Sequence, residues 1–142
     1  MIRKYHRSDA DQVMELWLAG NVDAHPFISK EYWQSHYEEV REQMSQAEVF
    51  VFEQDGRIQG FIGLVNEYIA GIFVDKNCRS RGIGRQLLAY AKEAHDALSL
   101  GVYQKNERAV AFYLREGFAV QSEALDEDTG EREYTMTMSR QI

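Results

Sequence analysis

A short segment between residues 79 and 85 combines arginines with glycines. It holds Arg79, Ser80, Arg81, Gly82, Ile83 and Gly84, followed by Arg85. Because glycine has no Cβ, the backbone at Gly82 and Gly84 can approach a phosphate closely. A helix that starts here presents unpaired N–H groups at the positive end of its dipole, and guanidinium groups add charge. We therefore expect residues 79–84 to bind a pyrophosphate.

The elements on either side of this segment must hold it in place. Residues Ile69 to Val74 are apolar, β-branched or aromatic, which predicts a buried strand that ends in a turn at 75–77. From Gly82 to about Ala97, apolar residues recur at helical spacing. The order is strand, glycine turn and helix, although the same glycines also suit a tight turn without a ligand.

The spacing of the glycines distinguishes between the known nucleotide-binding patterns, because it fits one of them and excludes two others. The pattern GxGxxG needs a glycine at position 87, where Leu87 stands, and GxxxxGK[ST] does not occur in the chain. The segment does match R/Q-x-x-G-x-G/A through Arg79, Gly82 and Gly84. It thus resembles the acetyl-CoA pyrophosphate loop of the GCN5-related N-acetyltransferase (GNAT) superfamily.

A second motif of the same superfamily follows at the expected distance. Residues 106–118 read N-x-x-A-x-x-F-Y-x-x-x-G-F, and 107–116 predict a short amphipathic helix that Gly117 ends. The stretches HPFI, GIFV, SRGIG and VYQKN are similar to a bacterial peptidyl-lysine N-acetyltransferase subgroup. The resemblance covers nearly the whole chain.

The resemblance implies a mixed α/β fold of the GNAT type. It has a mostly antiparallel sheet of about seven strands, flanked by four helices and splayed between the fourth and fifth strands. Our own interpretation of the pattern gives the same order, β-α-α-β-β-β-α-β-α-β-β, in one domain over residues 1–142. The predicted strands are 2–7, 49–53, 57–65, 69–74, 98–103, 118–123 and 133–138, with helices at 9–19, 29–46, 82–97 and 107–116, and an acidic loop at 125–131.

The resemblance also assigns roles to individual residues. The backbone N–H groups of Phe73 and Val74 would hold the thioester carbonyl and the pantetheine arm. Tyr113 would act as general acid toward the leaving thiolate, since a phenol can donate that proton, although simple packing beside Phe112 is the alternative. Asn106 would contact the pantetheine, and a plain helix N-cap is an equal alternative.

The general base is less well defined by the sequence, because an ammonium acceptor can lose its proton to several groups or to water. We rank Glu67 first, since it lies at the turn into the central strand, although an exposed carboxylate in a turn is ordinary. The other candidates are Tyr68, Tyr103, His25 and His36.

The segment around the only proline borders the acceptor side in the family. The resemblance therefore implies that His25 and Phe27 contact the acceptor, together with Tyr68 and Tyr103. A lone surface histidine is the alternative for His25.

Composition limits the classes of function. The net charge of −7 argues against nucleic-acid binding, which depends on Lys and Arg. The single cysteine, Cys78, forms no internal disulfide, and we find no signal peptide, membrane span or metal-ligand spacing among the four histidines. We expect a cytoplasmic protein without nucleic-acid or membrane partners, as a monomer or homodimer.

The sequence favours an enzyme that transfers an acetyl group from acetyl-CoA to a primary amine by direct attack in a ternary complex. A protein lysine is the first choice of acceptor, and a small amine such as a polyamine or a drug is the second. Two other hypotheses stay open: a non-catalytic acyl-CoA sensor and a phosphate-binding regulatory domain unrelated to CoA.

Overall fold

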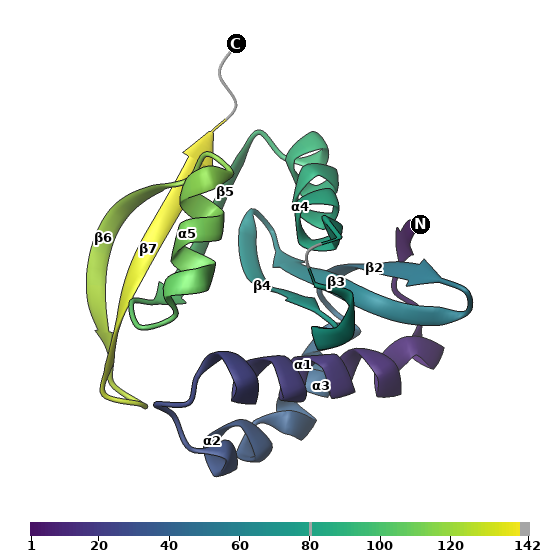
Figure 1. The fold of residues 1–142 in the computed structure, drawn as a ribbon, viewed down its shortest axis with the longest axis horizontal. Coiled ribbons are helices and arrows are strands. Elements are labelled where there is room, and N and C mark those ends of the chain that lie inside the picture. The colour runs from purple at the N-terminus through teal and green to yellow at the C-terminus, as the bar shows by residue number, and fades with distance from the viewer. Residues whose placement is uncertain (80, 140–142) are drawn as a thin grey trace.

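The chain forms one seven-stranded sheet with helices on both faces (Figure 1). The structure, a computed structural model, describes residues 1–79 and 81–139. The strand order is β1-β2-β3-β4-β5-β7-β6. The strands are β1 (Ile2–Lys4), β2 (Glu48–Gln54), β3 (Arg57–Val65), β4 (Tyr68–Val74), β5 (Ala97–Tyr103), β6 (Ala119–Asp126) and β7 (Glu131–Ser139).

Five α-helices occur in the described residues: α1 (Ala10–Ala24), α2 (Lys30–Ser35), α3 (Tyr37–Met44), α4 (Ile83–Ala94) and α5 (Glu107–Arg115). Two short 3-10 turns, Arg7–Asp9 and Lys76–Cys78, precede α1 and the glycine segment. In Figure 1, α1, α2 and α3 lie on one side of β2–β4, and α4 lies on the other. None of the helices in the described residues is long and apolar enough to cross a membrane.

The alternation of apolar residues along the strands builds a core on each face of the sheet. Val49 and Val51 of β2 pack with α1 to α3, whereas Phe50 and Phe52 pack with α4. Successive side chains of a strand point to opposite faces, so one apolar strand serves both cores.

The sheet opens between β4 and β5, as the family resemblance implies. The strands β2, β3 and β4 form an antiparallel meander, and α4 then crosses to β5, which runs parallel to β4. In the described residues, the β4–β5 register covers two pairs, Tyr68 with Ser99 and Ile69 with Leu100. Beyond Ile69 the backbone edge of β4 that faces β5 has no strand partner there.

The prediction that the first helix ends near Gly20 is wrong, because α1 continues to Ala24. A Cβ on Gly20 would lie 2.8 Å from Cδ1 of Phe73. The glycine therefore allows the helix to approach the β4 side chain and does not end the helix.

The single predicted helix 29–46 is two helices, so the described chain has five α-helices where four were expected. The break is at His36, whose N–H donates to the carbonyl of Trp33 at 3.1 Å in a tight turn. This turn lets α2 place Trp33 beside His25 and the cavity, while α3 packs against α1.

The remaining boundaries shift by a few residues. The Asp55-Gly56 hairpin turn is confirmed, with φ of 55° and 76°, and β1 is shorter than predicted. The predicted acidic loop 125–131 is shorter in the structure, since β6 and β7 pair as far as Asp126 with Glu131. A tight turn at 127–130, with Gly130 at φ 75°, closes this hairpin.

Candidate active site

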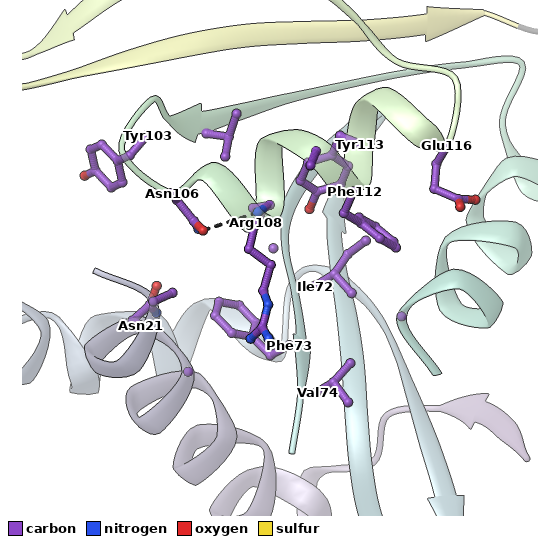
Figure 2. Close-up of a pocket in the computed structure, with 18 of the residues that line it drawn as sticks. Asn21, Ile72, Phe73, Val74, Tyr103, Asn106, Arg108, Phe112, Tyr113 and Glu116 are labelled. Carbon is purple, nitrogen blue, oxygen red and sulfur yellow. Dashed lines mark hydrogen bonds between the residues drawn. The ribbon is translucent and has the colours of Figure 1, made fainter. Parts of the chain in front are cut away.

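A cavity of about 1220 Å³ occupies the opening between β4 and β5 (Figure 2). Its walls come from the end of α1, from Trp33 of α2, from β4, from residues 78–79 and 82–85, from β5 and from α5, with one residue of β7. The glycine segment and the residues around Tyr113 thus face the same space, although about 30 residues of chain separate them.

The glycine segment forms one end of this cavity. Gly82 is the N-cap of α4 with φ 76°, a conformation that side chains disfavour, and it offers no side chain to the first N–H groups of the helix. Gly82, Ile83 and Gly84, which the sequence predicts to bind a pyrophosphate, line the cavity. Arg81 is exposed and is not among the described lining residues, and Ser80 lies outside the described residues.

Arg79 lies at the same end and is already paired. Its Nη2 atom donates to Oδ2 of Asp23, on α1, at 2.8 Å. This hydrogen bond lowers the pKa of the Asp23 carboxyl, with further help from the charges of Lys76 and Arg108. Figure 2 shows the Arg108 side chain reaching from α5 into the cavity, and Arg108 is not among the site residues predicted from the sequence.

The wall along β4 is apolar and closely packed. Ile72, Phe73 and Val74 line the cavity, and the Phe73 ring stacks on Phe61 with centroids 5.1 Å apart. The unpaired backbone edge of β4 runs beside these side chains. A long, flexible molecule with amide groups can therefore lie along this strand and hydrogen-bond to it.

Tyr113 projects from α5 into the cavity (Figure 2) and is only 8% exposed. Burial, and then the nearby Tyr68, raises the pKa of the phenol, so the hydroxyl keeps its proton at neutral pH. Asn106 caps α5, because its Oδ1 accepts from the Ala109 N–H at 3.3 Å. It also lines the cavity, so the two roles proposed for it are compatible.

Aromatic rings form the other end of the cavity. The His25 ring stacks on Trp33 and meets Tyr103 edge-on, with centroids 5.2 Å apart in both pairs. Burial lowers the pKa of His25, which is 9% exposed, so it is not the exposed histidine of the alternative interpretation. Phe27 packs against His25 and Tyr103 but does not itself line the described cavity.

The structure does not bring Glu67 to this site. Glu67 is exposed in the turn between β3 and β4 and is not among the described lining residues, nor is His36. The position of Glu67 therefore gives no support to its expected role as base. Tyr68 and Tyr103 do line the cavity.

A different carboxylate, Glu133 on β7, lines the cavity instead. One feature of the sequence could have indicated this role of Glu133: it is a charged residue at the start of a predicted strand whose other residues are apolar or carry a hydroxyl group. Its partner strand could not be read from the sequence, however, and pairing with β5 is what turns Glu133 toward the site.

The residues present fit an acyl-CoA. One end offers helix N–H groups and Arg79 for phosphates, the middle offers an apolar wall with a free strand edge, and Tyr113 lies beside it. The far end, with aromatic rings and a carboxylate, suits a cationic amine.

Comparisons with known proteins agree with this arrangement. Residues 18–140 match the acetyltransferase (GNAT) domain family. The chain is 37% identical over 131 residues to the peptidyl-lysine N-acetyltransferase YiaC of Escherichia coli, covering 91% of this chain and 90% of YiaC. It is 29% identical to the peptidyl-lysine N-acetyltransferase YjaB of E. coli, over 91% of this chain and 88% of YjaB.

A comparison with solved structures agrees on the fold. The solution structure of apo YjaB from E. coli superimposes with a TM-score of 0.86 at 24% identity, covering 99% of this chain and 98% of YjaB. The match to the domain family covers most of the chain, and the similarity to YiaC extends over nearly its full length. The chain therefore belongs to the GNAT family of acetyltransferases and is an acetyl-CoA-dependent N-acetyltransferase.

Proposed function

We propose that this enzyme acetylates the side-chain amine of lysine in proteins. Both E. coli relatives that cover about nine-tenths of the chain are named peptidyl-lysine N-acetyltransferases. The observation that carries the proposal is the far end of the cavity, where Trp33, Tyr103 and Glu133 line one space. Aromatic faces and a carboxylate favour an ammonium group on an apolar stem, which is the chemistry of a lysine side chain.

The phosphate end has a defined set of groups. The N–H groups at the start of α4, with Gly82 and Gly84 leaving room, hold the pyrophosphate, and Arg79 adds a charge-assisted hydrogen bond. Arg108 lines the same cavity and adds positive charge on the α5 side. Acetyl-CoA supplies an activated acetyl group as a thioester when it is bound.

The free edge of β4 orients the reacting carbonyl. The backbone N–H of Val74 points to this edge, donates to the thioester oxygen and stabilises the negative charge that develops there. The N–H of Phe73 points to β3 instead, because Phe73 lies opposite Phe61 and the N–H of Asp75, two residues on, donates to Gln59 of β3. Tyr113, whose buried phenol stays protonated at neutral pH, gives its proton to the sulfur that leaves. The acceptor amine attacks directly in a ternary complex.

A covalent acyl-cysteine route has no support from the cavity. Cys78 lies in the 3-10 turn before the pyrophosphate segment, at the end of the cavity that we assign to phosphate. No histidine lines the described cavity apart from His25, whose ring nitrogens face Asn21 and Asn106. Nothing there activates the thiol.

The experiment is a thiol-release assay with acetyl-CoA and an N-terminally acetylated peptide that contains one lysine, followed by mass spectrometry of the peptide. We expect peptide-dependent thiol release and one acetyl group on the lysine. A matched peptide with arginine in place of the lysine is the control and should give no thiol. Acetylation of spermidine but not of the peptide would identify a small-amine enzyme, and tight CoA binding without any product would identify a sensor.

We also propose that the enzyme works in the cytoplasm. Its one cysteine, Cys78, is buried and forms no disulfide in the described structure, which suits a reducing compartment.

A further inference from the structure

Three residues from three neighbouring strands meet where the sheet opens: Tyr68 of β4, Gly101 of β5 and Glu133 of β7. All three line the cavity. Glu133 lies directly opposite Tyr103 in the β5–β7 register, and Gly101 is two residues before Tyr103 on the same strand. Side chains at these positions therefore share one face of the sheet, the face that borders the cavity.

Gly101 leaves room for the other two side chains. A Cβ built on Gly101 would lie 3.1 Å from the Tyr68 hydroxyl oxygen and 3.4 Å from Oε2 of Glu133. The phenol and the carboxylate thus approach the same point above β5. Any larger residue at position 101 would fill the space between them, so the glycine keeps this point open to the cavity.

The Glu133 carboxylate has no partner within the described structure. It forms no ion pair and accepts no hydrogen bond there, whereas Glu131, two residues earlier on β7, pairs with Lys105 at 3.0 Å. Leaving a half-buried carboxylate without a partner costs free energy. A cationic group that arrives with the substrate would supply the missing partner.

Burial of Glu133, and then the charge of Asp126, raises the pKa of its carboxyl. A carboxylate with a raised pKa is a stronger base toward an ammonium proton. The titratable groups that face it are Tyr68 from β4, Tyr103 from β5, Asp126 from β6 and Tyr32 from α2. Burial is the main cause that raises the pKa of the Tyr68 and Tyr32 phenols, and the negative charge of Glu133 raises both further.

The reaction needs such a group. An amine with an ordinary pKa of about 10.4 arrives as an ammonium ion and must lose a proton before its lone pair can form the new C–N bond. We propose that Glu133 is the general base that takes this proton from the acceptor, in the space that Gly101 leaves open beside Tyr68. This rests on amine acetylation by the chain, and it applies whether the amine is a protein lysine or a smaller one.

The protons balance across the two ends of the site. Glu133 takes one proton from the ammonium and releases it to solvent. As the C–N bond forms and the C–S bond breaks, the sulfur receives the proton of Tyr113. The nitrogen gives up a second proton, which restores Tyr113.

The first test is the pH dependence of kcat/KM for Glu133→Gln, with the lysine peptide or, if only that is acetylated, spermidine. At pH 7 we expect a loss of about 100-fold or more. The loss should shrink about tenfold per pH unit, because the variant depends on the fraction of neutral amine. Glu133→Asp should recover part of the activity, and Glu67→Gln, an exposed carboxylate outside the cavity, should match the wild type. Parallel pH profiles, or a higher KM with unchanged kcat, would show that Glu133 only binds the cation.

A second readout does not need turnover. In a sample labelled with ¹³C at the glutamate carboxyls, the signal that disappears in Glu133→Gln should titrate above the ordinary range. It should also shift when n-butylamine is added in the presence of CoA. A Glu133 signal that titrates in the ordinary range and ignores n-butylamine would overturn the assignment. If the amine shifts the signal but no amine is acetylated, the proposed lysine activity fails and the placement of Glu133 at the acceptor site stands.

Discussion

The Nε2 atom of His25 lies 3.3 Å from Nδ2 of Asn106, although 81 residues separate them. Nδ1 of the same ring lies 2.9 Å from the carbonyl oxygen of Asn21, which can only accept. The hydrogen-bond network therefore assigns the proton to Nδ1 and leaves Nε2 to accept from the Asn106 amide. A neutral imidazole thus links the end of α1 to the start of α5, the helix that carries Tyr113.

This link predicts a pH-dependent stability. Burial holds the folded-state pKa of His25 below its ordinary value of 6.5, so the unfolded chain binds this proton more tightly than the folded chain. The contribution of His25 is complete above about pH 6.5 and is lost as the pH falls toward the folded pKa. Urea unfolding between pH 7.5 and 5.5 should show this loss in the wild type and a flatter profile in His25→Gln.

The same variant should lose about 1–2 kcal/mol at pH 7.5, because the stacking on Trp33 and the link to Asn106 are removed. If the free energy of unfolding changed equally with pH in the wild type and in His25→Gln, the pKa of His25 would be the same in the folded and unfolded states. The carboxyls of Asp9 and Asp23 have lowered pKa values, so their contribution to stability is lost at more acidic pH, below the range of this titration.

Gly20→Ala should destabilise the protein, against the usual gain of about 0.5–1 kcal/mol for this change in a helix. The new methyl group would lie 2.8 Å from Cδ1 of Phe73, whose ring is held against Phe61, so overpacking of about 1–3 kcal/mol outweighs the gain. Chemical denaturation measures the change. In a Phe73→Leu background the smaller side chain should remove the cost, and a cost that persists there would locate the strain elsewhere.

Arg79→Ala should weaken acetyl-CoA binding roughly 10- to 100-fold, the range of one or two charge-assisted hydrogen bonds to phosphate. Asp23→Asn should instead strengthen binding a few-fold, because the 2.8 Å ion pair no longer competes for the guanidinium. Titration calorimetry reports both. Arg41→Ala, which removes an ion pair to Asp11 away from the cavity, is the matched control. Weaker binding in Asp23→Asn would show that Asp23 positions Arg79 for the phosphate.

Tyr113→Phe should lower turnover about 100-fold or more and leave the affinity for acetyl-CoA within about twofold, because only the donated proton is lost. Tyr90→Phe, on the partly exposed side of α4, is the control and should match the wild type. Thiol release under saturating acetyl-CoA separates the two effects. Unchanged turnover in Tyr113→Phe would leave packing as the role of this side chain.

Local sequence determined the elements that depend on neighbouring residues. The Asp55-Gly56 turn, the glycine at the start of α4 and the cap at Asn106 are short-range features, so pattern and spacing were sufficient to predict them. The two motifs also identified the family and the cofactor end of the site.

Long-range packing decided what these patterns could not. In the sequence Gly20 suggests a helix end, but in the structure it makes room for Phe73. His36 suggests the middle of a helix, but in the structure it ends α2, which extends to the cavity. A glycine signals either chain reversal or close approach, and only the neighbour in space tells which.

The proposed general base illustrates most clearly the difference between what local sequence and what long-range packing determine. The sequence by itself determined that this is a GNAT-type chain with the glycine segment 79–84 and Tyr113, because those residues lie in contiguous motifs. Only the tertiary structure decided that Glu133, and not Glu67, faces the cavity. The reason is that the pairing of β5 with β7 sets which face each residue occupies, and a shift of one residue in that register would turn Glu133 away.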